Sequence, residues 1–232
     1  MKKTFSSFFL FFLLGISQQL SAQQGNQLSE KKETSQPSEN PIEKIDENNY
    51  RVGKLILNSK DRTVKLNGIL NMEKGIIELL ACATGGKVHE SVLVLDVVPY
   101  HLQVSMLLLG LKYKGGLEYQ GDPRTPQGDS VEIWVSWKRD GGDTTVRAED
   151  LVWDANQSKP MEHTSWVFVG SKMVEGRFMA DQEKSLITTF HDPFTIFDNP
   201  LQGGANDEVY TVNEKLVPRK GTPVTVTIKA TE

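Results

Sequence analysis

The sequence predicts an α+β domain in which strands dominate and one principal helix, over about residues 99–109, lies buried against them. Two observations lead to this fold class. Short segments rich in branched residues recur between turn-forming residues, as strands do, and a single segment has apolar side chains at helical spacing. Both patterns fall between residues 50 and 232, a length that suits a single domain with a substantial interior.

The clearest strand covers residues 130–138, where apolar and polar side chains alternate as in a strand with one buried face. Gly141 and Gly142 provide a turn, so we expect a hairpin that returns over residues 144–147. The other expected strands share short length, branched residues and flanking turn residues: 52–57, 63–70, 75–83, 88–95, 165–169, 177–180, 185–190, 208–212 and 223–229.

One segment breaks the strand pattern. Asp96 can cap a helix, Pro99 suits its first turn, and Gly110 ends the run. The apolar side chains at helical spacing are Leu102, Met106 and Leu109. Because Val104, Leu107 and Leu108 are apolar as well, most of the circumference is covered, which predicts a helix packed deeply against the sheet.

The start of the chain has the order of a secretory signal peptide. Lys2 and Lys3 supply a positive region, and the apolar run from Phe8 to Ile16 is about half the length that a membrane-spanning helix needs. Small residues before Gln23 suit signal peptidase, so we expect residues 1–22 to be removed after Ala22. No cysteine follows that could carry a lipid, and the sequence therefore predicts an exported protein, periplasmic or secreted.

Residues 23–49 are expected to form a disordered polar linker, because they contain no aromatic residue and few large apolar ones. Loss of residues 1–22 leaves 24 basic and 30 acidic side chains, a formal charge of about −6. The basic residues are spread among carboxylates along the sequence, which argues against binding to nucleic acid or to an anionic membrane surface.

Cys82 is the single cysteine of the chain. An intrachain disulfide is therefore impossible, and a cysteine-ligated iron–sulfur cluster is excluded because it needs several thiolates. Cys82 lies in an apolar segment with no activating neighbour, so we interpret it as a buried small hydrophobic residue rather than a catalytic thiol.

Three histidines are the candidates for chemistry. His89, His101 and His191, with Asp192 or Glu90, have the ligand types of a zinc site with an open water position, although their spacing matches no known metal signature. His89, Glu90, His101 and His191 are thus the catalytic candidates, and His89, His101, His191 and Asp192 the metal candidates. Structural hydrogen bonding is the alternative, and alternation along the strand 88–95 would place His89 and Glu90 on opposite faces.

Two further kinds of site are open. Acidic and amide residues between Asp192 and Glu208 have the oxygen ligands that calcium prefers, but such side chains also cap turns. Trp134 and Trp166 are candidate ligand-binding residues, since exposed tryptophans on a sheet can hold sugars or protein partners. Alternation puts Trp134 opposite Trp137 and so toward solvent, unless a second layer covers that face.

Several short motifs resemble the YdjY-domain family of exported bacterial proteins. They are spread over nearly the whole domain: Gly86–Ser91, Pro99–Leu102 with the leucine-rich segment after it, Arg147–Asp150, Trp166–Ser171, His191–Pro193, Asp198–Pro200 and Asp207–Glu208. The resemblance implies an extracytoplasmic domain without an established activity. Some members of that family carry cysteine-rich iron–sulfur segments, and this chain departs from them.

The function expected from the sequence is therefore a noncatalytic module that binds a ligand or partner outside the cytoplasm. The alternative is a metal-dependent enzyme that uses a His, Asp and Glu site. Neither a ligand nor a cofactor can be named from the sequence.

Overall fold

A computed structural model describes residues 42–139 and 141–231. The predicted signal peptide, residues 1–22, lies outside the described residues. The predicted linker, residues 23–49, is described only from residue 42, and there β1 (Ile42–Lys44) pairs antiparallel with β2 (Asn49–Val52).

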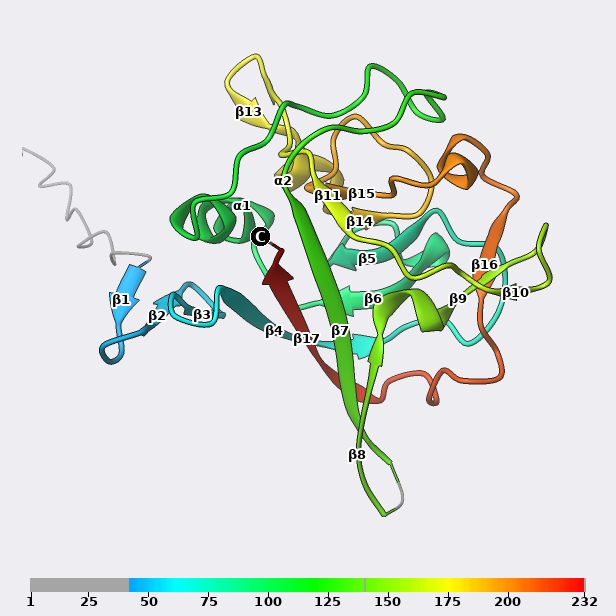
Figure 1. The fold of residues 1–232 in the computed structure, drawn as a ribbon, viewed down its shortest axis with the longest axis horizontal. Coiled ribbons are helices and arrows are strands. Elements are labelled where there is room, and N and C mark those ends of the chain that lie inside the picture. Colours follow the sequence, from blue (N-terminus) through cyan, green and yellow to red (C-terminus); the bar gives the residue numbers. More distant parts are fainter. Residues whose placement is uncertain (1–41, 140, 232) are drawn as a thin grey trace, which may run out of the picture. The chain divides into compact units, whose positions relative to one another are not determined.

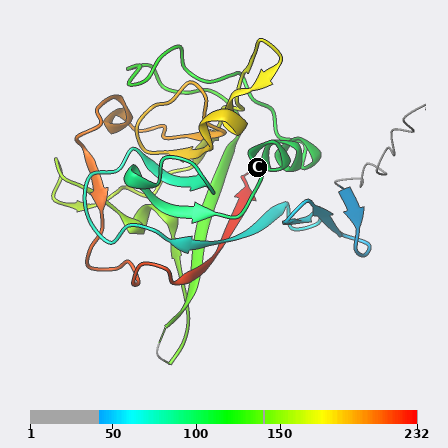
Figure 2. The ribbon, with the colours of Figure 1, turned by 180° about the vertical axis from the view of Figure 1, so that it is seen from behind.

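The centre of the fold is a closed barrel of eight strands (Figures 1 and 2). Closure follows from the pairing of β6 with β4, the strand that begins the series. Two neighbouring pairs, β14–β15 and β5–β6, are parallel and the others are antiparallel. In spatial order the strands are β4 (Thr63–Leu70), β17 (Pro223–Ala230), β7 (Ser130–Arg139), β11 (Trp166–Phe168), β15 (Phe197–Asp198), β14 (Ser185–Thr188), β5 (Leu79–Ala83) and β6 (Ser91–Leu95). The strand-dominated α+β prediction is confirmed.

Alternation along the long strands builds the core. On β7, Val131, Ile133, Val135 and Trp137 are buried, whereas Glu132, Trp134 and Ser136 are partly exposed on the other face. β4 and β17, which flank this part of the barrel, show the same period of two. Each large aliphatic side chain buried in this way contributes about 1.5–3 kcal/mol of transfer free energy.

The hairpin predicted after residue 138 is present. β8 (Gly142–Arg147) pairs antiparallel with β7, and the hairpin extends beyond the rest of the barrel (Figure 1). Gly141 at the turn has φ +98°, in the left-handed region that favours glycine.

The predicted principal helix is α1 (Pro99–Leu108), and its inner side chains Leu102 and Met106 are fully buried. The covered part of its circumference is narrower than the apolar pattern indicated, because Leu107 and Leu108 are exposed. The cap also differs from the expectation. The backbone N–H of Tyr100 donates to Asp181 Oδ1 of α2 (Met179–Glu183), while Asp96 pairs with Lys54.

A hairpin replaces the single strand expected over residues 52–57. β2 ends at Val52 and β3 (Leu55–Asn58) returns beside it, because Gly53 turns the chain with φ +57°. β3 then pairs with β4, so β1, β2 and β3 continue the sheet away from the barrel (Figure 1).

The remaining elements are short. They are two small sheets, β9 (Val152–Asp154) with β10 (Lys159–Pro160) and β16 (Tyr210–Val212), and β12 (Met173–Val174) with β13 (Arg177–Phe178), and three 3₁₀ turns, η1 (Val88–Glu90), η2 (Ala148–Leu151) and η3 (Gln202–Ala205). Within the described residues, none of the helices has the length and apolar character needed to cross a membrane.

Candidate functional site

The three histidines that the sequence singled out occupy different surroundings. His89 is exposed on η1, with its Nε2 3.4 Å from Glu90 Oε2. The expectation that His89 and Glu90 lie on opposite faces of a strand was wrong, because residues 88–90 form a 3₁₀ turn and strand β6 starts only at Ser91. This pair is a solvent-facing contact at the side of the barrel.

His101 lies on α1 and packs against the turn between β2 and β3. A Cβ atom built on Gly53 would lie 2.2 Å from His101 Nδ1, so the ring rests directly on the backbone of that turn. The histidine therefore holds the helix and the hairpin together, away from the other two histidines.

His191 is 1% exposed, and both of its ring nitrogens face backbone carbonyl groups. Nδ1 lies 2.6 Å from the oxygen of Asp122 and Nε2 lies 2.9 Å from the oxygen of Asn199. Both ring nitrogens are therefore directed at backbone carbonyl groups inside the protein and not at an open position where a metal could bind. The Asp122 carboxylate accepts from Arg124, which holds the pKa of that carboxyl well below its usual range.

Two buried carboxyl groups complete this inward-facing network. Asp192 accepts from Ser185 Oγ at 2.9 Å. Asp198 Oδ1 accepts from Thr188 Oγ1 at 3.0 Å and from the Asn199 N–H at 2.8 Å, while Asp198 Oδ2 is buried without a partner. Desolvation raises the pKa of Asp198 well above its usual value. No group of three or more His, Cys, Asp and Glu side chains among residues 42–139 and 141–231 is arranged to hold a metal ion.

The two candidate tryptophans differ in burial. Trp166 is 0% exposed and belongs to the core. Trp134 is half-buried on the outer face of β7, with the Arg147 guanidinium 5.4 Å from the ring centroid. Arg147 in turn bonds to buried Glu149 at 2.7 Å, so part of the Trp134 ring covers a buried ion pair.

Cys82 is fully buried on β5, and desolvation raises the pKa of its thiol. A thiol in this state is a poor nucleophile. The chain holds no other cysteine, so it has no set of thiolates for an iron–sulfur cluster.

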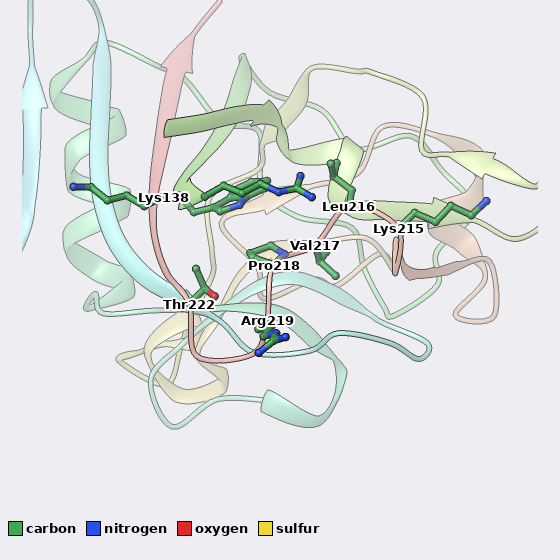
Figure 3. A pocket seen from close by; sticks show the side chains of 9 residues that line it. Lys138, Lys215, Leu216, Val217, Pro218, Arg219 and Thr222 are labelled. Atoms are coloured by element: carbon green, nitrogen blue, oxygen red, sulfur yellow. The ribbon is translucent and has the colours of Figure 1, made fainter. Parts of the chain in front are cut away.

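An open cavity of about 690 Å³ lies where the turn end of the β7–β8 hairpin meets the segment that leads into β17 (Figure 3). Its lining includes four basic residues from these two segments, Lys138, Arg139, Lys215 and Arg219. We call it the basic cleft. Figure 3 shows Lys138 and Lys215 extending to opposite sides, with Leu216, Val217 and Pro218 between them. Trp137, buried to 4% exposure, also lines it.

One wall of the basic cleft is the loop between β16 and β17, and hydrogen bonds fix this loop at both ends. Asn213 Nδ2 donates to the carbonyl of Asp150 at 2.8 Å, and the backbone N–H of Leu216 donates back to the carbonyl of Asn213 at 3.0 Å. At the other end, the Gly221 N–H donates to the carbonyl of Leu70 at 2.7 Å. The backbone that presents Lys215 and Arg219 is therefore fixed before any ligand arrives, which lowers the entropy lost on binding.

The cations of the basic cleft have no ion-pair partner among the described carboxylates, although Asp143 lies opposite Lys138 in the β7–β8 register. No carboxylate among the described residues lines it, and the described carboxylates form no ion pair with Lys138, Arg139 or Arg219. The Lys215 ammonium lies 4.6 Å from the Trp153 ring centroid, a contact that keeps its charge. Several cations at one concave surface attract anions, and arginine can bind a carboxylate or phosphate through two parallel hydrogen bonds.

Sequence reasoning missed this cleft. It treated the basic residues as dispersed, because Lys138–Arg139 and Lys215–Arg219 are far apart along the chain. The segment from Lys215 to Lys220 contains three basic residues and no carboxylate, which is the one signal that was present. Only the pairing of β17 with β7 brings the two segments together.

Comparison with known proteins gives one match. The model of the YdjY domain family matches residues 55–229, from β3 to the last strand. No curated protein and no solved structure matches the chain.

Proposed function

The chain belongs to the YdjY domain family, and we propose that it is a noncatalytic binding module outside the cytoplasm whose basic cleft holds an anionic group of its ligand. The single observation that carries this proposal is the set of four basic residues around one open cavity without a described carboxylate. Phosphate, sulfate and carboxylate groups share the chemistry that such a surface recognises.

The placement of the other polar candidates supports a binding role. His191, Asp192 and Asp198 face into the protein and bond to neighbouring side chains or backbone, so they are not presented to a substrate. His89 and His101 lie on separate elements. The basic cleft presents cations to solvent, and these bind anions and do not by themselves supply acid–base chemistry near neutral pH.

Inorganic polyphosphate tests the cleft, because it carries anionic charge without sugar, amide or base. The double variant Arg139→Glu/Arg219→Glu is expected to weaken its binding about tenfold or more in calorimetric titration at low salt, since two attractions become repulsions. Higher salt is expected to weaken binding to the unaltered protein. Melting temperatures of all variants verify that the fold is kept.

The matched control is Lys60→Glu/Lys114→Glu, which makes the same change in net charge at two exposed lysines outside the cleft. This control is expected to bind polyphosphate almost as the unaltered protein does. An equal loss in both double variants would show attraction to net charge alone, and an unchanged affinity in the cleft variant would remove the cleft as the site.

The extracytoplasmic location rests on the order of charged, apolar and small residues over residues 1–22. Intact-mass measurement of the protein produced in a bacterial host is expected to find Gln23 as the first residue. Retention of Met1, with the protein among cytosolic markers after fractionation, would contradict export.

A further inference from the structure

A second cavity adjoins the basic cleft on the outer face of the barrel. It has a volume of about 450 Å³ and is lined by residues of β4, β17, β7 and β8, with one carboxylate, Asp143, opposite Lys138 in the β7–β8 register. Trp137 and Lys138 line both cavities, and Thr222 of the first is followed directly by Pro223 of the second. The start of β17 therefore lies between the two cavities, and one extended ligand can cross it from the cleft to the face of the sheet.

A row of four polar side chains crosses this outer face. Register places Asn67 beside Thr225, Thr225 beside Ser136, and Ser136 beside Thr145, and all four line the second cavity. Neighbouring strands are about 4.8 Å apart, so the row spans about 14 Å, which favours an extended ligand. We call it the polar row.

The polar row keeps hydrogen-bonding capacity for a ligand. Thr225 Oγ1 donates to Asn67 Oδ1 at 3.2 Å, and the amide N–H₂ group of Asn67 stays free to donate. Ser136 Oγ and Thr145 Oγ1 share one hydrogen bond at 2.9 Å, which leaves one hydroxyl hydrogen and several lone pairs available. Donors and acceptors alternating along a line match the hydroxyl groups of a sugar chain.

The neighbouring row on the same face combines two polar side chains with one aromatic ring. It contains Lys65, Thr227 and Trp134 in register, with Trp134 half-buried against Arg147. Within the second cavity, Trp137 is 4% exposed, so the described residues there offer no open aromatic ring on which a nucleic-acid base could stack. The lining of the second cavity therefore fits hydroxyl groups better than bases.

We infer that the basic cleft and the polar row form one elongated site for an acidic polysaccharide, whose anionic groups lie in the cleft and whose hydroxyl groups bond to Asn67, Ser136, Thr145 and Thr225. This inference rests on the proposed function of the cleft and adds the class of ligand. Charge complementarity selects an acidic polymer over a neutral one, and the length of the row selects a chain over a single sugar.

The experiment compares polygalacturonate, neutral dextran, inorganic polyphosphate and single-stranded DNA by calorimetric titration of the full protein. Polygalacturonate is expected to bind more tightly than dextran. The variant Ser136→Ala/Thr225→Val removes two hydroxyl groups from the polar row without changing charge, and is expected to weaken polygalacturonate binding about tenfold. The same variant is expected to leave polyphosphate binding unchanged.

The matched control, Ser59→Ala/Thr84→Val, makes the same chemical changes at two exposed positions outside both cavities, and is expected to keep both affinities. If polyphosphate binds and the row variant leaves the affinity for polygalacturonate unchanged, the polysaccharide inference is overturned and the proposal of an anion-binding cleft remains. If neither polyphosphate nor polygalacturonate binds, the proposed function of the cleft and the polysaccharide inference are both overturned. If single-stranded DNA binds as tightly as polygalacturonate and the row variant weakens the binding of both equally, the polysaccharide inference is overturned in favour of a nucleic-acid ligand.

Discussion

At the scale of single residues, Asp198 shows how burial sets chemistry. Its side chain is 0% exposed, and only one of its two oxygens has hydrogen-bond partners. An ionised carboxylate would leave part of its charge unsolvated, and nearby Asp192 adds repulsion, so the pKa of Asp198 lies well above that of an exposed carboxyl. The folded protein therefore keeps the proton on Asp198 up to a higher pH than the unfolded chain does.

This difference predicts a pH dependence of stability. Because the folded protein holds the proton more tightly, the contribution of Asp198 to stability is complete below the carboxyl pKa of the unfolded chain and falls as pH rises toward the raised folded value. Asp198→Asn keeps the acceptor for Thr188 and Asn199 and never ionises. We expect the variant to melt at a higher temperature than the unaltered protein at pH 8, and the difference to disappear near pH 4.

Thermal melts monitored by circular dichroism from pH 4 to pH 8 measure this effect. Asp61→Asn, in the exposed turn before β4, is the control and should melt like the unaltered protein across the range. A melting temperature of Asp198→Asn below that of the unaltered protein at pH 8 would show that the carboxylate, not the neutral acid, is the form that the fold requires.

At the scale of elements, periodicity predicted the strands that are long and half-exposed. β4 matches its expected range, and β7 and β17 extend only one residue beyond theirs, because eight or more residues of alternation leave a clear signal. β10 and β15 have two residues each, too few for any period, and neither was expected. Their places depend on partners that are distant in sequence.

Two expected strands are shorter than predicted, because part of each forms a turn that is supported by a residue distant in sequence. Gly53 divides the segment 52–57, since its positive φ makes a turn and the His101 ring occupies the place of a Cβ atom. The sequence shows the glycine but not the histidine that packs on it. At residues 88–90, Asn71 Nδ2 donates to the carbonyl of Val88 at 2.6 Å, and this contact from the residue after β4 supports the 3₁₀ turn.

The candidate site likewise has parts that depend on local sequence and parts that depend on partners distant in sequence. Its local parts could be read from the sequence, because the predicted hairpin places Lys138 and Arg139 beside its turn. The opposite wall comes from the loop before β17, and its position depends on the register between β17 and β7. Periodicity identifies each strand but not its neighbours in the barrel, so the cleft could not be predicted.

At the scale of the whole molecule, the order of the barrel strands makes folding depend on the end of the chain. β17, the last strand, lies between β4 and β7 and pairs with both along nearly its whole length. Its inward side chains, Val224, Val226 and Ile228, are buried in the core. The barrel therefore cannot close through contacts between neighbours in sequence alone, and these long-range pairings are expected to make folding slow.

A chain that ends at Thr222 is accordingly expected not to fold. Without β17, β4 and β7 would each expose an unpaired edge, and the core would lose three buried aliphatic side chains, more than the few kcal/mol by which domains are usually stable. We expect loss of the near-ultraviolet circular dichroism that buried Trp137 and Trp166 produce, and no cooperative melt. The control ends at Ala230, keeps all of β17, and should melt cooperatively. A cooperative melt of the shorter chain would mean that the remaining strands can close among themselves.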